Sequence, residues 1–376
     1  MTWIVIALLV AFTARRWALL VGALLPPRLA GGSATPAVLV VVAARNEAWQ
    51  IEPLLHALAA LDYPPDKMSF ALVSDGSSDE TAGVCRRWCE GRAHATTLDL
   101  GHVGKAAAVT EAMKAAPAAD LLAVYDADQR PRPDSLRHLV HPFDDARVGA
   151  VAGYRCPINA DRGIVSRYAA LETWVHQLVV LAGKDRWHLN PPTMGGNCAY
   201  RVAAVADLGG FPAQTPTEDI EVSLALIARG WRTRFVRDSV AESRVGVSLR
   251  HYLSQRVRWT YGMYGTRRRA RSVEGFAVSS GYADRLVFAT AGVLAVTDRM
   301  SDVWLTAYLS TALIVVLTAL AKAGRLRGAP VYLLGAVPMF LVDIGSTAYA
   351  TALALVRREP PWHQARDRAP SASMRS

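Results

Sequence analysis

The strongest constraint on the fold is a run of 19 residues without a charged side chain, 303–321. A helix of that length rises by about 28 Å, which is close to the roughly 30 Å of a bilayer's hydrocarbon core. We therefore expect a transmembrane helix there. A second apolar stretch, 330–356, contains Asp343. A carboxyl group at membrane depth indicates either a functional residue or a carboxyl that is neutral or hydrogen-bonded between helices.

Two other apolar segments are less decisive. Residues 2–25 contain Arg15 and Arg16, which are costly at a bilayer centre. This predicts either a tilted anchor or two short interfacial pieces, and no small-residue cleavage site marks a signal peptide. Residues 286–296 are too short to span a bilayer, so we expect a re-entrant or interfacial helix there.

The charged residues, 20% of the chain, are concentrated between about residues 45 and 272. This distribution favours one large soluble domain with membrane helices at both ends. The net charge is +10, and the cations crowd just before the C-terminal apolar region, at Arg250, Arg256, Arg258, Arg267, Arg268, Arg269 and Arg271. That placement suits a membrane surface or a diphosphate rather than nucleic acid. It also predicts that the soluble domain is cytoplasmic.

The four cysteines are spaced unlike a structural zinc site, which indicates reduced, mostly buried thiols. They are Cys85, Cys89, Cys156 and Cys198.

Strand-like and helix-like segments alternate in the soluble part. Valine-rich or apolar runs predict strands at 37–44, 70–77, 95–98 and 120–128, and helical patterns lie at 48–60, 78–90 and 104–116. This alternation predicts an α/β fold with a parallel sheet, in which ligands bind at the carboxyl ends of the strands.

Asp75 ends the second predicted strand, and Gly76 after it permits a sharp turn. The segment is either an ordinary strand-to-helix turn, with Ser78 or Asp79 capping the next helix, or a nucleotide site. In a nucleotide site the Asp75 carboxylate accepts a hydrogen bond from a base or ribose.

Asp126 and Asp128 flank Ala127 at the end of a strand. In an extended chain, residues two apart point to the same face. Two adjacent carboxylates repel unless a cation bridges them, and oxygen ligands of this kind select Mg²⁺ or Mn²⁺ together with substrate phosphates. The alternative is a solvated turn before Pro131 and Pro133.

The segment Thr215, Pro216, Thr217 and Glu218 predicts a capping box that opens a helix. Asp219 then lies in the first turn, where the helix dipole stabilises an anion and lowers a carboxyl pKa. A general-base role for Asp219 therefore requires compensation from a pocket or a neighbouring carboxylate.

Gln255, Arg258 and Trp259 lie on one helix face at i, i+3 and i+4. An amide, a guanidinium and an indole suit binding of a sugar and a diphosphate, although they equally suit a membrane-interface helix. Two other motifs are excluded. The segment 101–105 is not a phosphate loop, because Asp99 and Ala106 replace required residues, and no G-x-G-x-x-G follows the first strand.

The order of these motifs carries a resemblance. The chain contains RNE, DGSSD, GK, DAD, GNCAYR, TED and QRVRW in sequence. Over about residues 37–262 it resembles family 2 of the inverting glycosyltransferases, which contains cellulose, chitin and hyaluronan synthases and ceramide glucosyltransferase. The resemblance implies a GT-A fold, a UDP-sugar donor and Mg²⁺ or Mn²⁺.

The resemblance also implies roles by position. Asp75 would contact uridine, with Asn46 and Glu47 nearby, and Lys105 would bind the donor. Asp126 and Asp128 would bind diphosphate and metal, and Asp219 would be the catalytic base. The acceptor and diphosphate end would be lined by Glu218, Gln255, Arg258 and Trp259. The first loop reads AARNE, whereas many members carry an aromatic residue before the asparagine.

The predicted organisation is a membrane anchor at 1–30, a catalytic domain at 31–247, an interfacial segment at 248–284, a membrane region at 285–358 and a polar tail at 359–376. We expect a multi-pass protein of the plasma membrane that transfers a hexose or N-acetylhexosamine to a growing polysaccharide or glycolipid. The predicted spans are few for a channel that secretes a polysaccharide. Secretion would require a partner membrane subunit or a homo-oligomer, and a single addition to a lipid acceptor stays open as an alternative. The alternative of another class is an inactive membrane scaffold that assists a synthase.

Overall fold

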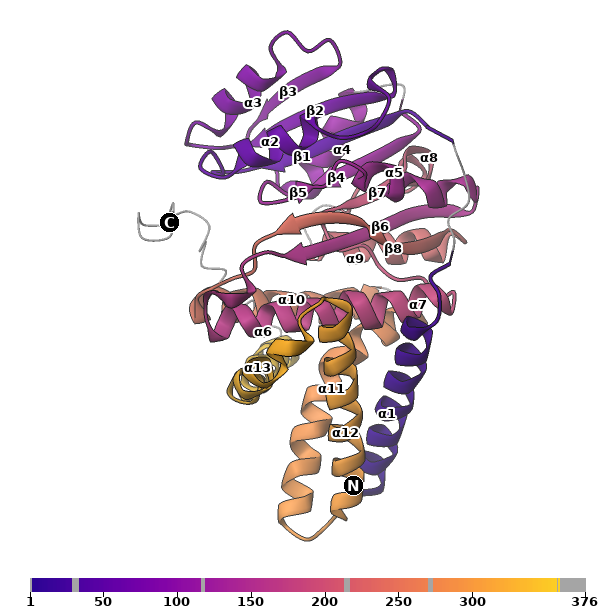
Figure 1. Cartoon of the computed structure of the whole chain (residues 1–376), viewed down its shortest axis with the longest axis vertical. Coiled ribbons are helices and arrows are strands. Elements are labelled where there is room, and N and C mark those ends of the chain that lie inside the picture. The colour runs from indigo at the N-terminus through magenta and orange to yellow at the C-terminus, as the bar shows by residue number, and fades with distance from the viewer. Residues whose placement is uncertain are drawn as a thin grey trace. The chain divides into compact units, whose positions relative to one another are not determined.

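Figure 1 shows the computed structural model of the chain, which describes residues 2–28, 34–115, 119–212, 217–269, 273–356 and 358. The described residues form two compact units. The sheet unit lies within 34–158 and 190–244, and the helical unit lies within 2–28, 159–189 and 245–358. Residues 159–189 thus group with the helices, while the catalytic boundaries 31–247 stay a prediction.

The sheet unit contains one sheet of eight strands in the order β3-β2-β1-β4-β7-β6-β8-β5. The strands are β1 (Val38–Ala44), β2 (Met68–Asp75), β3 (Ala95–Leu100), β4 (Leu121–Tyr125), β5 (Arg130–Pro131), β6 (Val148–Pro157), β7 (Cys198–Arg201) and β8 (Arg232–Ser243). Strands β3, β2, β1 and β4 are parallel, as the sequence predicts, and β7 runs antiparallel to β4 and β6.

Helices pack on both faces of this sheet (Figure 1). They are α2 (Ile51–Ala59), α3 (Thr81–Cys89), α4 (Lys105–Ala115), α5 (Ser135–Val140), α8 (Val202–Asp207) and α9 (Glu218–Ala228), with short 3₁₀ turns at Pro65–Lys67 and His141–Asp144. Successive residues of β1 point to opposite faces. Val40 and Val42 join one core with Leu54, whereas Leu39 and Val41 join the other. The continuous apolar run of β1 is therefore explained by two buried faces.

The helical unit contains α1 (Thr2–Leu24), α6 (Ile164–Trp174), α7 (Ala182–Arg186), α10 (Leu249–Arg269), α11 (Val273–Val296), α12 (Asp302–Lys322) and α13 (Ala329–Leu355). A π-helical segment, Val175–Leu181, joins α6 to α7, and 3₁₀ turns lie at Ala160–Arg162 and Leu326–Gly328. Helices α1, α11 and α12 lie side by side (Figure 1).

Within the part of the chain that the structure describes, three helical segments are long and apolar enough to cross a membrane, namely Thr2–Leu24, Asp302–Lys322 and Leu326–Leu355. The helix expected at 303–321 is confirmed, and residues 2–25 form one continuous helix rather than two pieces. Residues 286–296 form the second half of the 24-residue α11, and their re-entrant or interfacial placement stays a prediction.

Arg16 and the polar middle of α11 are accommodated by hydrogen bonds between helices. Arg16 donates to the carboxylate of Asp284 at 2.7 Å and to the hydroxyl of Tyr308 at 2.7 Å, and Tyr308 donates to Asp284 at 2.9 Å. Asp284 of α11 is thus bonded to partners on two other helices, as a polar group in a bilayer requires.

Asp343 is buried and belongs to a charged quartet of Glu172, Arg256, Arg285 and Asp343. Arg285 donates from Nε to Asp343 and from Nη2 to Glu172 at 3.2 Å. Arg256 donates to Glu172, and its Nε lies 4.0 Å from Asp343. Of the two readings of Asp343 in the sequence, the contacts favour a carboxylate bonded between helices, because two cations neutralise two anions here.

Candidate active site

The predicted site residues of the sheet unit lie at one edge of the sheet. The register places Ala44 of β1 beside Ser74 of β2, and Val42 of β1 beside Tyr125 of β4. The carboxyl ends of β1, β2 and β4 therefore meet, which is where open α/β sheets bind ligands.

Asp75 is buried at the end of β2 and holds the loop before α4. Its carboxylate accepts hydrogen bonds from the backbone N–H of Val103 at 2.7 Å and of Gly104 at 3.1 Å, and it contacts Nδ1 of His102 at 3.0 Å. These bonds fix the chain that leads into Lys105. In this structure Asp75 thus positions the loop, while its contact with a uridine stays a prediction.

Asn46 and Glu47 lie on the neighbouring loop, after β1. The side-chain oxygen of Asn46 accepts a hydrogen bond from the backbone of Ser78 at 2.8 Å, and the backbone N–H of Glu47 donates to Thr81 at 2.9 Å. Asn46 has φ of 55°, a left-handed conformation that asparagine tolerates. The loop after β1 is therefore tied to the segment that follows Asp75 and leads into α3.

Asp126 forms an ion pair with Lys105 across the same edge. The ammonium of Lys105 also donates to the backbone carbonyl of Gly195 at 2.7 Å. Burial opposes the charge of Lys105, but Asp126 and Glu218 outweigh it and raise the pKa of Lys105. The ammonium of Lys105 thus connects its own helix, α4, to the turn after β4 and to the loop before β7.

The expectation that Asp126 and Asp128 lie in extended chain is wrong. Strand β4 ends at Tyr125 and a turn follows, closed by the backbone N–H of Gln129 bonding to the carbonyl of Asp126 at 3.0 Å. The two carboxylates nevertheless act on each other. Burial, and then the charge of Asp126, raise the pKa of Asp128 to about 6.

A pair of glycines packs against these carboxylates. A Cβ atom at Gly196 would lie 2.5 Å from Oδ2 of Asp126 and 2.6 Å from Nε2 of Gln129. At Gly195, which has φ of +80°, a Cβ atom would lie 3.4 Å from Oδ2 of Asp219. Only glycine allows this backbone to approach so closely.

Asp219 lies in the first turn of α9, where its Oδ1 accepts the N–H of Ile220 at 2.9 Å. Its backbone carbonyl accepts hydrogen bonds from Thr193 at 2.9 Å and Ser223 at 2.8 Å. Burial, and then the neighbouring Glu218, raise the pKa of Asp219 to about 6. This supplies the compensation that a base in a first helical turn requires.

The helix begins at Glu218, with Thr217 as its N-terminal flanking residue. Of the predicted capping box, Thr215 and Pro216 lie outside the described residues.

Two parts of the site were not predicted from the sequence. Arg155 on β6 acts on the pKa of both Asp128 and Asp219, lowering each. The loop that carries Gly195 and Gly196 precedes β7 directly. The consecutive glycines were the available signal for the loop, whereas nothing local distinguishes Arg155 from other strand arginines.

Gln255, Arg258 and Trp259 lie on α10 of the helical unit and are half-buried. The guanidinium of Arg256, between them in sequence, lies 5.2 Å from the ring centroid of Trp259. Their predicted contact with an acceptor or diphosphate stays a prediction.

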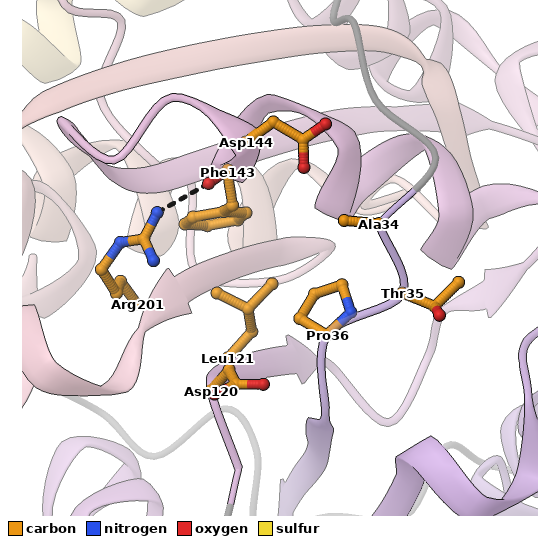
Figure 2. A pocket seen from close by; sticks show the side chains of 8 residues that line it. All are labelled: Ala34, Thr35, Pro36, Asp120, Leu121, Phe143, Asp144 and Arg201. Carbon is orange, nitrogen blue, oxygen red and sulfur yellow. Dashed lines mark hydrogen bonds between the residues drawn. The ribbon is translucent and has the colours of Figure 1, made fainter.

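Figure 2 shows a pocket in the sheet unit. It is lined by Ala34, Thr35, Pro36, Asp120, Leu121, Phe143, Asp144 and Arg201. Arg201 donates to the backbone carbonyl of Phe143 at 2.7 Å. Because Pro36 and Asp120 precede β1 and β4, this pocket lies at the amino ends of the parallel strands and is not the predicted donor site.

Residues 36–262 match the family described as "Glycosyltransferase like family 2". The chain belongs to this family. It is therefore a family 2 glycosyltransferase, and the GT-A fold and enzyme class implied by the motif order are confirmed.

Two curated relatives show the breadth of this family. The chain is 30% identical to an N-acetylglucosaminyltransferase of Bradyrhizobium diazoefficiens over 60% of this chain and 48% of the relative. It is 28% identical to the beta-monoglucosyldiacylglycerol synthase of Synechocystis over 64% of this chain and 51% of the relative. The chain spans about half the length of the curated relatives it matches.

A solved structure shares the fold of this glycosyltransferase. The mannosyltransferase PcManGT of Pyrobaculum calidifontis, solved with GDP-Man and Mn²⁺, has a TM-score of 0.65 and 22% identity, and the match covers 94% of this chain and all of that chain.

Proposed function

We propose that this family 2 glycosyltransferase transfers a hexose or N-acetylhexosamine from a UDP-sugar to a glycan or glycolipid acceptor, with inversion, at the cytoplasmic face of the plasma membrane. The observation that carries the proposal is the convergence of Asp219, Lys105 and the Asp126–Asp128 turn on one glycine loop.

Asp219 would act as the base. It takes the proton of the acceptor hydroxyl, the acceptor oxygen bonds to the anomeric carbon, and the bond from that carbon to the donor diphosphate breaks. UDP leaves with the charge that develops on its terminal phosphate. A carboxyl pKa of about 6 suits this task, because Asp219 is then ionised at neutral pH and still a stronger base than an exposed aspartate.

Asp126 and Asp128 would hold Mg²⁺ or Mn²⁺. Among the described residues no three His, Cys, Asp or Glu side chains form a metal cluster, which is consistent with a metal bound by two carboxylates and substrate phosphates. The fit rests on the donor set, since one tight turn carries both carboxylates and oxygen ligands are what these ions prefer. Such an ion would stabilise charge on the leaving diphosphate, and Lys105 would add a second cation.

Membrane association is supported by apolar side chains that remain exposed on the candidate spans. They include Ile4, Val10 and Val21 on α1, Leu309 and Leu313 on α12, and Leu334, Val337 and Leu341 on α13. An exposed apolar surface of this kind indicates lipid contact. The cytoplasmic orientation rests on the arginines before residue 272.

The test is nucleoside diphosphate release by the detergent-solubilised chain with a panel of UDP-sugars and with GDP-mannose, with and without Mn²⁺ or Mg²⁺. Metal-dependent release from one UDP-sugar supports the proposal, whereas release from GDP-mannose alone contradicts the donor. Sizing the product separates a long glycan from a single addition to a lipid. Complete inactivity with a lipid extract as acceptor, alone and with candidate partner subunits, would favour an inactive scaffold.

A further inference from the structure

Helix α1 packs tightly against α7 through the face that carries Arg15, Leu19 and Gly22. A Cβ atom at Gly183 would lie 2.2 Å from the carbonyl oxygen of Leu19, and one at Gly22 would lie 2.5 Å from Nε1 of Trp187. That indole donates to the carbonyl of Ala18 at 2.7 Å. This packing brings Arg15, one helical turn before Leu19, close to Lys184, which follows Gly183.

Three cations gather where α1, α7 and α11 meet, and we call Arg15, Arg16 and Lys184 the α1–α7 cation cluster. Arg16 pairs with Asp284 at 2.7 Å. Arg15 donates at 2.7 Å to the hydroxyl of Ser280, which carries no charge. Among the described residues, no hydrogen bond or ion pair is found for the ammonium of Lys184. Within the described residues, Asp284 is the one carboxylate that accepts a hydrogen bond from these three cations.

Several N–H groups of this cluster are buried without an acceptor. They are Nε of Arg15 and Nη1 of Arg16, together with Nε of the adjacent Arg186 on α7. Burial, and then the charge of Arg15, lower the pKa of Lys184 to about 8. Buried N–H groups without an acceptor are costly, so these groups would gain from a ligand with several acceptor oxygens.

We propose that the α1–α7 cation cluster binds the phosphate headgroup of a membrane lipid through Arg15 and Lys184. A phosphate offers the multiple acceptors that a guanidinium and an ammonium require. The cluster is built on α1, an apolar helix long enough to cross a bilayer, and basic pockets between such helices are suited to lipid headgroups. There is space beside Arg15 at α11, because a Cβ atom at Gly281 would meet Nη2 of Arg15 at 3.9 Å and no other heavy atom within 4 Å.

The test measures thermal unfolding and lipid binding of the full-length protein in detergent, with no sugar donor present, so the result is independent of glycosyl transfer. The probes are phosphatidylglycerol, phosphatidic acid, phosphate-free diacylglycerol and inorganic phosphate. We expect the two phospholipids alone to raise the melting temperature of the wild type, since a ligand of the folded state stabilises it.

Lys184→Met is the decisive variant. Removing a half-buried cation that has no hydrogen-bond or ion-pair partner among the described residues should raise the melting temperature of the lipid-free protein or leave it unchanged. It should weaken phosphatidylglycerol binding at least ~10-fold, as expected when a charge-assisted hydrogen bond is lost. Removing a purely structural lysine would lower the melting temperature, so weaker lipid binding without that loss indicates a binding role.

Arg327→Gln is the matched control, because Arg327 is exposed in the turn before α13. It should bind phosphatidylglycerol as the wild type does, and Arg15→Lys, which retains the charge, should keep most of the binding. Equal binding by Lys184→Met and wild type would overturn the proposal. Stabilisation by inorganic phosphate equal to that by phosphatidylglycerol would overturn the lipid as the source of the phosphate.

Discussion

The sheet unit gives Asp219 the environment of a base. A carboxylate in the first turn of α9 would have a low pKa from the helix dipole alone, but burial and Glu218 act in the opposite direction. The N–H of Ile220 and the charges of Lys105 and Arg155 lower the pKa and limit the rise. The balance therefore depends on neighbours from β6, α4 and the helix itself.

Asp219→Asn should lower sugar transfer by ~10²–10⁴-fold, the usual contribution of a positioned base, and leave UDP binding nearly unchanged. The measurements are product formation and UDP affinity by calorimetry. Burial penalises a charged carboxylate but not a neutral amide. The variant should therefore unfold at the same temperature as the wild type or at a higher one at pH 7.5. Equal loss of donor affinity and turnover would show that Asp219 binds the donor instead.

The rate of transfer at saturating Mn²⁺ should rise as pH increases and reach half of its maximum near pH 6, because Asp219 must lose its proton to act as base. The same shift predicts a stability change of opposite direction. The folded-state pKa lies above the reference value of 3.8, so the contribution of Asp219 to the free energy of unfolding is full below about pH 4 and is lost as pH rises through about 6. A rate that is flat from pH 5 to 8 would contradict this.

At the scale of elements, the site depends on a close approach of backbone segments. The chain before β7 lies against the turn after β4 and the start of α9, and Gly195 and Gly196 make this possible. In the helical unit the charged quartet plays a comparable part, since Glu172 on α6, Arg256 on α10, Arg285 on α11 and Asp343 on α13 connect four helices.

Gly196→Ala should lower turnover by about 10²-fold while the protein remains folded, because the added methyl group must displace the side chain of Asp126 or Gln129. A shift of about 1 Å at a catalytic group is sufficient for that loss. Gly101→Ala is the matched control, as a Cβ atom there meets nothing within 4 Å. Turnover and circular dichroism of both variants provide the check; equal activity of the two would refute the role of the glycine loop.

The charged quartet should show strong coupling between Arg285 and Asp343. Asp343→Asn or Arg285→Gln alone leaves one buried charge unbalanced, which costs about 3–5 kcal/mol. The double variant restores neutrality through Glu172 and Arg256, so it should lose less stability than the sum of the single variants. Thermal unfolding in detergent of all four proteins measures the cycle. Additive losses would mean that the pairs contribute independently.

At the scale of the whole molecule, one chain combines a GT-A sheet unit with three helical segments suited to a bilayer. Expressed in bacteria, it should remain in the membrane fraction after alkaline carbonate and require detergent for release. Trypsin should cleave the sheet unit in inside-out vesicles and spare it in intact spheroplasts, as the positive-inside rule predicts. The opposite protection pattern would place the catalytic face outside.

The sequence by itself determined the elements whose signals are local. Strand β1, the helices before and after Asp75 and the helix at 303–321 all formed as predicted, because each has a pattern of apolar residues that is set by neighbours in the sequence. The order of the motifs likewise determined the family.

Only the tertiary structure decided features that depend on distant partners. The pairing of Asp284 in α11 with Arg16 and Tyr308 depends on how three helices pack. Arg155 acts on Asp128 and Asp219 because the pairing of β6 in the sheet brings it near them. Neither can be predicted from local pattern, since the electrostatic cost or benefit of a charge is set by the groups that folding brings near it.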